Sequence, residues 1–228
     1  MTAPGLAEID ACVFDAYGTL FDFLSASKRC RDALGDKAEA LGQLWRTRQL
    51  EYSWLRSLMG AHADFWQVTG EALDFTMASL GIENAVLRDR LMDLFLNIEA
   101  FPDARRVLEA LRRAKRTTAI LSNGSPRMLT AAVKSAGVEG LLDHVLSIED
   151  AHIYKPHRSV YELVTDRLKI PAERVCFVSS NGWDAAGAAH FGFRAVWANR
   201  GKQPRERLPG RLTAEIPSLD ALPGLLGL

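Results

Sequence analysis

Four groups of polar residues stand where short apolar runs of the chain come to an end. They are Asp15, Ser122-Asn123, Lys155-Pro156 and the segment 179–184. A single Asp after an apolar run is often only a turn or cap residue. Four such groups together indicate a site, because ligands of an open parallel sheet bind beyond the carboxyl ends of its strands. A carboxylate there can act as a nucleophile, and a buried one needs cationic and amide donors around it. Lys155 is the obvious cation.

The elements that must position these residues alternate along the chain. Short apolar runs are typical of buried parallel strands, and the amphipathic patterns between them predict helices with glycines just past several ends. The predicted strands are 9–14, 117–121, 141–146, 175–178 and 194–198, and the predicted helices include 104–114, 127–136, 160–168 and 185–190. This alternation predicts an α/β fold, a doubly wound parallel sheet covered on both faces.

The segment 24–97 breaks the alternation, because it contains no convincing strand and its pattern predicts several amphipathic helices. The longest is expected over 37–59. We expect 24–97 to form a small helical cap domain inserted after the first strand, and 1–23 with 98–228 to form the core domain. Asp103 is expected to cap the next core helix. The tail after Asn199 is expected to be a loop, followed by a helical turn over 218–222 that Pro223-Gly224 stops.

The composition limits the classes of partner. Of 228 residues, 48% are hydrophobic and 25% are charged, and the formal net charge is +0. A packed core is therefore expected, and no overall field favours nucleic acid or an anionic membrane as a partner. The sequence shows no apolar stretch of the roughly 20 residues that span a bilayer and no signal-peptide pattern, so we expect a cytoplasmic protein.

Cysteines and histidines give no metal-binding pattern along the sequence. The three cysteines lack metal-ligand spacing, and Cys12 and Cys176 sit in apolar runs, which predicts buried thiols in a reducing compartment. The five histidines form no pair at metal-ligand spacing, so the sequence predicts no functional role for them.

The motifs together resemble a known superfamily. Val13-Phe14-Asp15-Ala16-Tyr17-Gly18-Thr19-Leu20 resembles the nucleophile motif of the haloacid dehalogenase superfamily. Leu121-Ser122-Asn123 is similar to its second motif, Lys155-Pro156 to its third and Ser179-Ser180-Asn181-Gly182-Trp183-Asp184 to its fourth. Each motif is weak alone, but their order and the cap insert extend the resemblance over nearly the whole chain.

Two departures separate the chain from the magnesium-dependent phosphatases of that superfamily. Tyr17 stands where those enzymes have a second Asp, and Ser179-Ser180 stands where they usually have a metal-binding Asp. Hard cations require such carboxylates, so we expect no metal and no cofactor. The remaining pattern resembles the L-2-haloacid dehalogenases.

The resemblance implies catalytic roles for six residues. Asp15 is the expected nucleophile, Lys155 holds it ionised, and Thr19 orients it. Ser179 and Asp184 are expected to hold Lys155 and to help position the hydrolytic water. Arg46 shares a helical face with Leu50 and Trp54, so spacing alone also allows a surface arginine. The resemblance favours a halide site formed by the residues Arg46, Asn123 and Trp183.

The resemblance also implies a set of substrate-binding residues. The amides after Ser122 precede a helix start and form a ready site for the substrate carboxylate, and Ser122 can also cap that helix, since both roles use the same geometry. Tyr161 matches an active-site tyrosine, although its pattern also suits the core. The full expected set is Ala16, Tyr17, Leu50, Phe65, Ser122, Asn123, Gly124, Tyr161, Asn181 and Trp183.

The expected activity is hydrolysis of L-2-haloalkanoic acids to D-2-hydroxy acids, with inversion at C2 and an aspartyl ester on Asp15. The expected partners are this small-molecule substrate and the halide product, and the resemblance also implies a second copy of the chain in a homodimer. A phosphatase of the same superfamily and a non-catalytic binding protein remain as alternatives. The sequence leaves open the preferred halogen, the chain length and the group that activates water.

Overall fold

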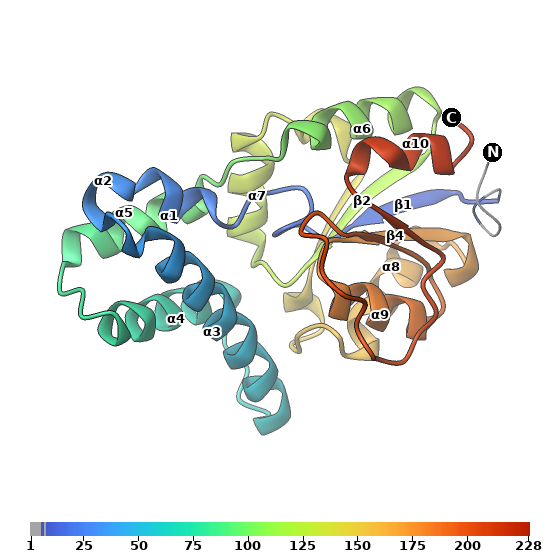
Figure 1. The fold of residues 1–228 in the computed structure, drawn as a ribbon. Coiled ribbons are helices and arrows are strands. Elements are labelled where there is room, and N and C mark those ends of the chain that lie inside the picture. Colours follow the sequence, from blue (N-terminus) through green and yellow to red (C-terminus); the bar gives the residue numbers. More distant parts are fainter. Residues whose placement is uncertain (1–5, 7) are drawn as a thin grey trace.

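A six-stranded parallel sheet forms the centre of the molecule (Figure 1). The computed structural model describes residues 6 and 8–228. The strand order is β3-β2-β1-β4-β5-β6. The strands are β1 (Ala11–Phe14), β2 (Thr117–Ser122), β3 (His144–Ser147), β4 (Val175–Ser179), β5 (Arg194–Ala198) and β6 (Ala214–Ile216). Every residue of β1 is buried, because this apolar strand lies between β2 and β4 with helices over both faces.

Helices cover both faces of the sheet, which confirms the predicted doubly wound fold. Figure 1 shows α6 and α10 on one face and α8 and α9 on the other. The core helices are α6 (Pro102–Arg113), α7 (Pro126–Ser135), α8 (Arg158–Leu168), α9 (Gly182–Phe191) and α10 (Leu222–Leu225). The short 3₁₀ turns are η1 (Glu139–Leu141), η2 (Ile148–Asp150), η3 (Ala172–Arg174) and η4 (Leu219–Ala221).

The segment 24–97 is helical and lies beyond the carboxyl end of β1 (Figure 1). Its helices are α1 (Ser25–Arg29), α2 (Arg31–Leu34), α3 (Lys37–Met59), α4 (Phe65–Ser79) and α5 (Ala85–Leu96). The expected long helix is present with the expected bounds, and it is followed by the cap residue Gly60, whose φ of 64° suits glycine. We propose that the chain divides into a cap domain, 24–97, and a core domain made of the rest.

Two features hold α3 and α4 together in the cap. The indole nitrogen of Trp45 donates to the carbonyl of Thr69 at 2.8 Å, and the amide of Gln49 donates to the hydroxyl of Thr69 at 2.6 Å. The Asp64 carboxylate accepts from the backbone N–H of Gln67 and so caps the start of α4. The two hydrogen bonds to Thr69 fix the face of α3 that carries Arg46.

Several expected details of the core were wrong. Asp103 does not cap α6, because Pro102 already opens the helix; its buried carboxylate instead binds Arg200 and the N–H of Leu219. Residues 139–141 form a 3₁₀ turn, so β3 begins only at His144. The tail also contains β6, a short edge strand.

The end of the chain differs from its predicted form as well. Pro223 lies in the first turn of α10 and does not stop it, because that turn needs no N–H from the proline. All three cysteines are free and buried, as predicted. Within the described residues, no helix combines the length and the apolar character needed to cross a membrane.

Candidate active site

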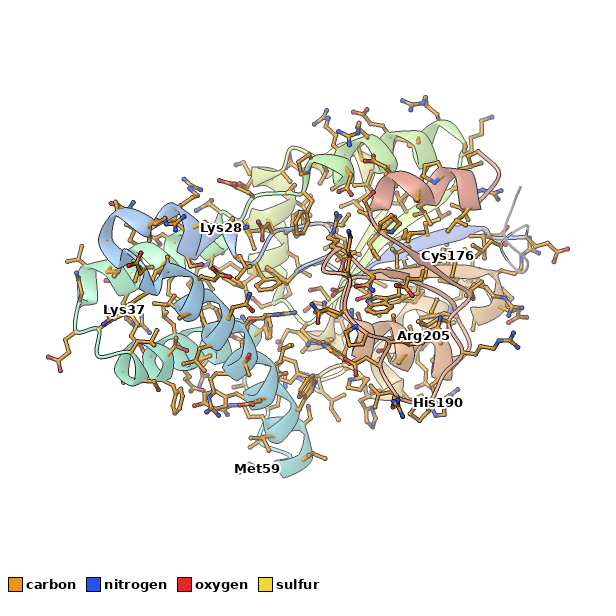
Figure 2. The ribbon with its side chains drawn as sticks, viewed as in Figure 1. Lys28, Lys37, Met59, Cys176, His190 and Arg205 are labelled. Atoms are coloured by element: carbon orange, nitrogen blue, oxygen red, sulfur yellow. The ribbon has the colours of Figure 1, made fainter. Side chains whose placement is uncertain are left out.

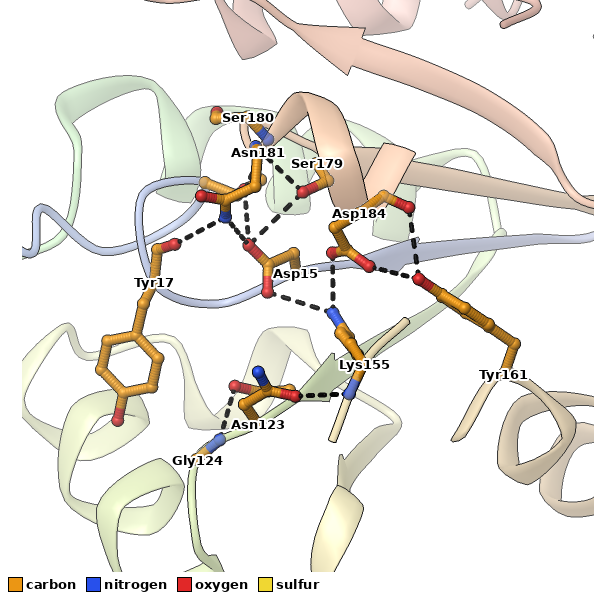
Figure 3. Close-up of polar contacts among 12 residues, drawn as sticks. Asp15, Tyr17, Asn123, Gly124, Lys155, Tyr161, Ser179, Ser180, Asn181 and Asp184 are labelled. Carbon is orange, nitrogen blue, oxygen red and sulfur yellow. Dashed lines mark hydrogen bonds and ion pairs between the residues drawn. The ribbon is translucent and has the colours of Figure 1, made fainter. Parts of the chain in front are cut away.

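Asp15 follows β1 and lies among four donors (Figure 3). Its Oδ2 accepts from the amide of Asn181 at 2.7 Å, the hydroxyl of Thr19 at 3.1 Å and the hydroxyl of Ser179 at 3.4 Å. Its Oδ1 accepts from Lys155 Nζ at 3.1 Å. The carboxylate side chain is only 9% exposed. One oxygen is therefore crowded by donors, while the other contacts a single cation and keeps lone pairs free.

Lys155 is completely enclosed between two carboxylates. Its Nζ lies 3.1 Å from Asp15 and 2.8 Å from Asp184, and its side chain is 1% exposed. Burial by itself lowers the pKa of this ammonium, but the attraction of Asp15 and Asp184 outweighs burial and raises the pKa above its ordinary value. Lys155 therefore stays charged in the core of the site.

Asp184 is the second carboxylate that pairs with Lys155. Burial raises the pKa of Asp184, and the positive charge of Lys155 opposes that rise. The hydroxyl of Tyr161 donates to Asp184 Oδ1 at 2.8 Å, so Tyr161 lies on the opposite side of Asp184 from Asp15 (Figure 3). The expectation that Ser179 holds Lys155 was wrong, because its hydroxyl contacts Asp15 and accepts from the N–H of Asn181.

Arg46 reaches from α3 of the cap to this cluster. One terminal nitrogen of its guanidinium donates to the Gln49 side chain at 2.8 Å, and the other terminal nitrogen donates to Asn181 Oδ1 at 3.3 Å. Asn181 in turn donates to Asp15, so a single amide links the arginine to the carboxylate. Burial lowers the pKa of Arg46, and the charge of Asp15 partly offsets this effect. These contacts place Arg46 inside the molecule and overturn the alternative of a surface arginine.

Gln49 is a residue that the sequence analysis missed. Its side chain is 1% exposed, accepts from Arg46 and donates to Thr69, so it holds the guanidinium in place. The available signal was its position three residues after Arg46 on the same helix. Arg200 was missed as well; it donates to the carbonyl of Thr19 at 2.9 Å and pairs with Asp103.

The loop after β2 supplies amide groups near the same cluster. Asn123 Oδ1 accepts from the backbone N–H of Lys155 at 3.1 Å, which turns its amide nitrogen toward Asp15 (Figure 3). Ser122 Oγ accepts from the N–H of Gly124 at 3.0 Å. Ser122 is not the cap of α7, because Ser125 occupies that position. A Cβ on Gly124 would lie 2.9 Å from the ring of Tyr17, so only glycine fits there without a shift.

Aromatic rings form the wall toward the cap. Tyr17 stacks on Phe95 at 5.3 Å between ring centroids and lies 6.0 Å from Phe65. Burial raises the pKa of Tyr17 far above its ordinary value, so its hydroxyl stays protonated. Ala16 is fully buried, and Leu50 is half-buried one turn after Arg46.

Trp183 is the expected site residue that lies apart from this group. In the described part of the chain its indole makes no hydrogen bond and packs edge-on against Trp54 of the cap, with ring centroids 5.3 Å apart. It also lines a separate, mainly apolar cavity of about 240 Å³ with Tyr161 and Phe191. Its expected contact with the halide therefore stays a prediction.

Comparison with known proteins places these residues in a family. Residues 9–192 match the family of haloacid dehalogenase-like hydrolases. The chain belongs to this family. It is 48% identical over 219 residues to "(S)-2-haloacid dehalogenase 1" of Pseudomonas sp. (strain CBS-3), a match that covers 96% of each chain.

Solved structures agree with this family membership. A crystal structure of a dehalogenase with an intermediate complex is 47% identical and superposes with a TM-score of 0.95, covering 97% of this chain and 98% of the other. The L-2-haloacid dehalogenase of Xanthobacter autotrophicus with chloropropionic acid covalently bound is 37% identical with a TM-score of 0.87, covering 96% and 98%. The family resemblance inferred from the motifs is confirmed.

The residues around Asp15 do not fit the magnesium ion of the phosphatases in this family. Tyr17 presents an aromatic ring to Phe95 where those enzymes place a second carboxylate. The ammonium of Lys155 already bridges Asp15 and Asp184, so it takes the place of a cation between these carboxylates and balances one of their two charges.

Proposed function

We propose that this chain hydrolyses L-2-haloalkanoic acids to D-2-hydroxy acids through an ester on Asp15. The observation that carries the proposal is the asymmetry of the Asp15 carboxylate. Three donors hold Oδ2, whereas Oδ1 contacts only Lys155. A carboxylate oriented in this way is suited to nucleophilic attack with one defined oxygen.

In the first step, Asp15 Oδ1 attacks C2 of the substrate from the face opposite the halogen. The new carbon–oxygen bond forms as the carbon–halogen bond breaks, the halide leaves with the bonding electron pair, and C2 is inverted. Arg46 and Asn123 supply donors for the developing halide charge. The Nε of Arg46 supports this role, because it is buried and has no hydrogen-bond partner among residues 6 and 8–228. Trp183 is retained as the third proposed halide residue.

In the second step, water attacks the carbonyl carbon of the ester. The carbonyl oxygen at that stage is the former Oδ2, so negative charge develops where Thr19, Ser179 and Asn181 donate. These three groups therefore act as an oxyanion site. Of the two protons of the attacking water, one passes to the departing oxygen on C2 and the other is released to solvent. Collapse of the tetrahedral intermediate breaks the bond between the carbonyl carbon and the former Oδ1, restores the Asp15 carboxylate, and releases the D-2-hydroxy acid with that oxygen as its hydroxyl oxygen.

The substrate carboxylate is assigned to the loop between β2 and α7. The hydroxyl of Ser122 has a proton to donate, and the amides at the start of α7 add the positive end of the helix dipole. Gly124 lets the chain pass close to Tyr17. Leu50 and Phe65 are proposed to line the apolar part of the pocket, and Tyr161 is proposed to position Asp184.

Racemic 2-chloropropionate in buffer with excess chelator tests the proposed function. Chloride release that stops at half conversion, with D-lactate formed and D-substrate left, is the expected result. Hydrolysis of a phosphate ester after magnesium is restored, without chloride release, would support the phosphatase alternative. Binding of haloacids with neither reaction would support a non-catalytic binding protein.

Arg46→Ala is expected to lower the rate of chloride release by about 10²- to 10³-fold, the usual cost of removing one donor to a developing charge. The loss should be smaller with the iodo substrate, because iodide is the better leaving group and needs less stabilisation. Single-turnover rates for the two substrates measure this difference. Arg48→Ala on the same helix is the matched control, since Arg48 pairs with Glu51 away from Asp15. Equal small losses for both halogens would contradict the halide role.

On the alkaline side, kcat/KM is expected to stay constant until the pH exceeds 10.5, the ordinary pKa of lysine. Lys155 must be charged, and its pKa is raised, so the active form persists below that value and is lost only as the pH rises through the raised pKa. Asp184→Asn removes one attracting charge and should move this alkaline limb to lower pH. An unchanged limb in Asp184→Asn, with the fold intact by circular dichroism, would contradict this role of Lys155.

We also propose that the protein is cytoplasmic and forms a homodimer through its cap. Leu58 and Met59 at the end of α3 support a contact with a second copy, since they are 85% and 75% exposed (Figure 2 labels Met59). Light scattering should give the mass of a dimer for the wild type and of a monomer for Leu58→Ser/Met59→Ser. A monomeric wild type would contradict the proposal.

A further inference from the structure

A second contact between the cap helices and the sheet domain lies apart from the Asp15 cluster. His62 lies in the loop between α3 and α4, while Glu149 lies in η2 and His152 follows it. His62 Nε2 lies 2.9 Å from Glu149 Oε2. The ring of His152 meets the ring of His62 edge-on, with centroids 5.5 Å apart. Two imidazoles and one carboxylate therefore meet where the two parts of the molecule touch.

These three side chains have the chemistry and proximity of metal ligands. Each offers one ligand atom, and the three atoms lie within 4.8 Å of one another. Among residues 6 and 8–228 this is the only group of three or more His, Cys, Asp or Glu side chains placed in this way. Two histidines and a carboxylate are a common Zn²⁺ donor set that leaves a fourth position for water. His152 is exposed, so the ion can enter from solvent.

Unpaired buried atoms of the same residues also point to a ligand. His62 Nδ1 and Glu149 Oε1 are buried and have no hydrogen-bond partner among the described residues. Buried polar atoms are rarely left without a partner, and a bound ion can supply the missing one. The contact between His62 and Glu149 therefore leaves one polar atom of each side chain without a hydrogen-bond partner among the described residues.

The two loops are held at a fixed separation by neighbouring contacts. The hydroxyl of Tyr154 donates to the carbonyl of Ala63 at 2.5 Å, and the backbone N–H of Tyr154 donates to the hydroxyl of Ser57 at 3.2 Å. The φ of His152 is 50°, a conformation that glycine adopts more easily than histidine. The ligands are thus presented by backbone that is already in place.

We propose that His62, Glu149 and His152 bind one Zn²⁺ ion that ties the cap loop to the loop leading to Lys155. The spacing of the histidines does not predict this pair, because His62 and His152 come together only in the fold. Since the ligands come from both loops, the ion stabilises the arrangement in which the two loops touch.

Titration of the tag-free, chelator-treated protein with zinc chloride, followed by calorimetry, tests this site. We expect one ion per chain, and no corresponding binding of Mg²⁺, which prefers oxygen ligands. His152→Gly should weaken Zn²⁺ binding by at least about tenfold, since loss of even an outer partner of a metal ligand commonly costs that much. Glycine suits the backbone at 152, so this variant is expected to fold.

The matched control is His190→Gln, which removes an exposed histidine of α9 and should leave Zn²⁺ binding unchanged. X-ray absorption of the 1:1 complex should show two imidazoles and no sulfur, since the three cysteines are buried. No Zn²⁺ binding by the wild type, unchanged binding by folded His152→Gly, or sulfur ligation would each overturn the proposal. None of these readouts depends on the proposed enzymatic activity.

Discussion

Asp15→Asn is expected to abolish release of halide from L-2-chloropropionate, with a loss of roughly 10⁴- to 10⁶-fold, as when other catalytic nucleophiles are removed. The amide has nearly the same shape as the carboxylate, but its oxygen is a weak nucleophile and carries no charge. Lys155 keeps Asp184 as a partner in this variant, so the fold should persist. Chloride release and the mass of the intact protein after mixing with substrate measure the effect.

The matched control for this variant is Asp166→Asn, which removes an exposed carboxylate of α8. It should keep wild-type turnover and form the same substrate adduct. Chloride release by Asp15→Asn at the wild-type rate would show that another group attacks C2. The catalytic roles of Thr19, Ser179 and Asn181, which depend on their hydrogen bonds to Asp15, would then fail as well.

Lys155→Met is expected to reduce turnover to near the background rate. Without the ammonium, Asp15 and Asp184 face each other as two buried carboxylates, and an anionic substrate is repelled from the site. Leaving buried charges unpaired also costs stability, about 3 to 5 kcal/mol for a pair broken by removing one partner. Steady-state kinetics and denaturant unfolding measure the two losses separately.

The double variant Lys155→Met/Asp184→Asn distinguishes catalysis from stability. Removing the second buried charge should recover most of the lost stability, because the remaining carboxylate keeps three hydrogen-bond donors. Turnover should stay low, because the cation beside Asp15 Oδ1 is still missing. Recovery of turnover together with stability would mean that Lys155 serves the fold alone.

The strands and long helices were predictable because one dominant signal governs each of them. β5 (Arg194–Ala198) and α3 (Lys37–Met59) have the expected bounds, since an apolar run or a helical period defines them and glycine marks an end. β6 was missed because its three residues pair at the sheet edge on one side only, where no apolar run is needed.

The members of the site were easier to predict than their partners. The motifs supplied Asp15, Lys155 and Asp184, which do meet at the strand ends. Which hydroxyl contacts which carboxylate depends on side-chain rotamers, so Ser179 was assigned the wrong partner. The contact of Gln49 with Thr69 and that of His62 with His152 form only when separate elements pack together, so spacing along the chain did not predict them.

A single turnover in water labelled with ¹⁸O, with the enzyme in excess over L-2-chloropropionate, tests the ester on Asp15 most directly. Water attacks the ester carbonyl in the proposed mechanism, so the lactate hydroxyl should contain no ¹⁸O and the peptide that carries Asp15 should gain one ¹⁸O atom. Mass spectrometry of the lactate and of that peptide gives both results from one sample. Labelled lactate with unlabelled Asp15 would show direct attack of water on C2 and would contradict the ester mechanism.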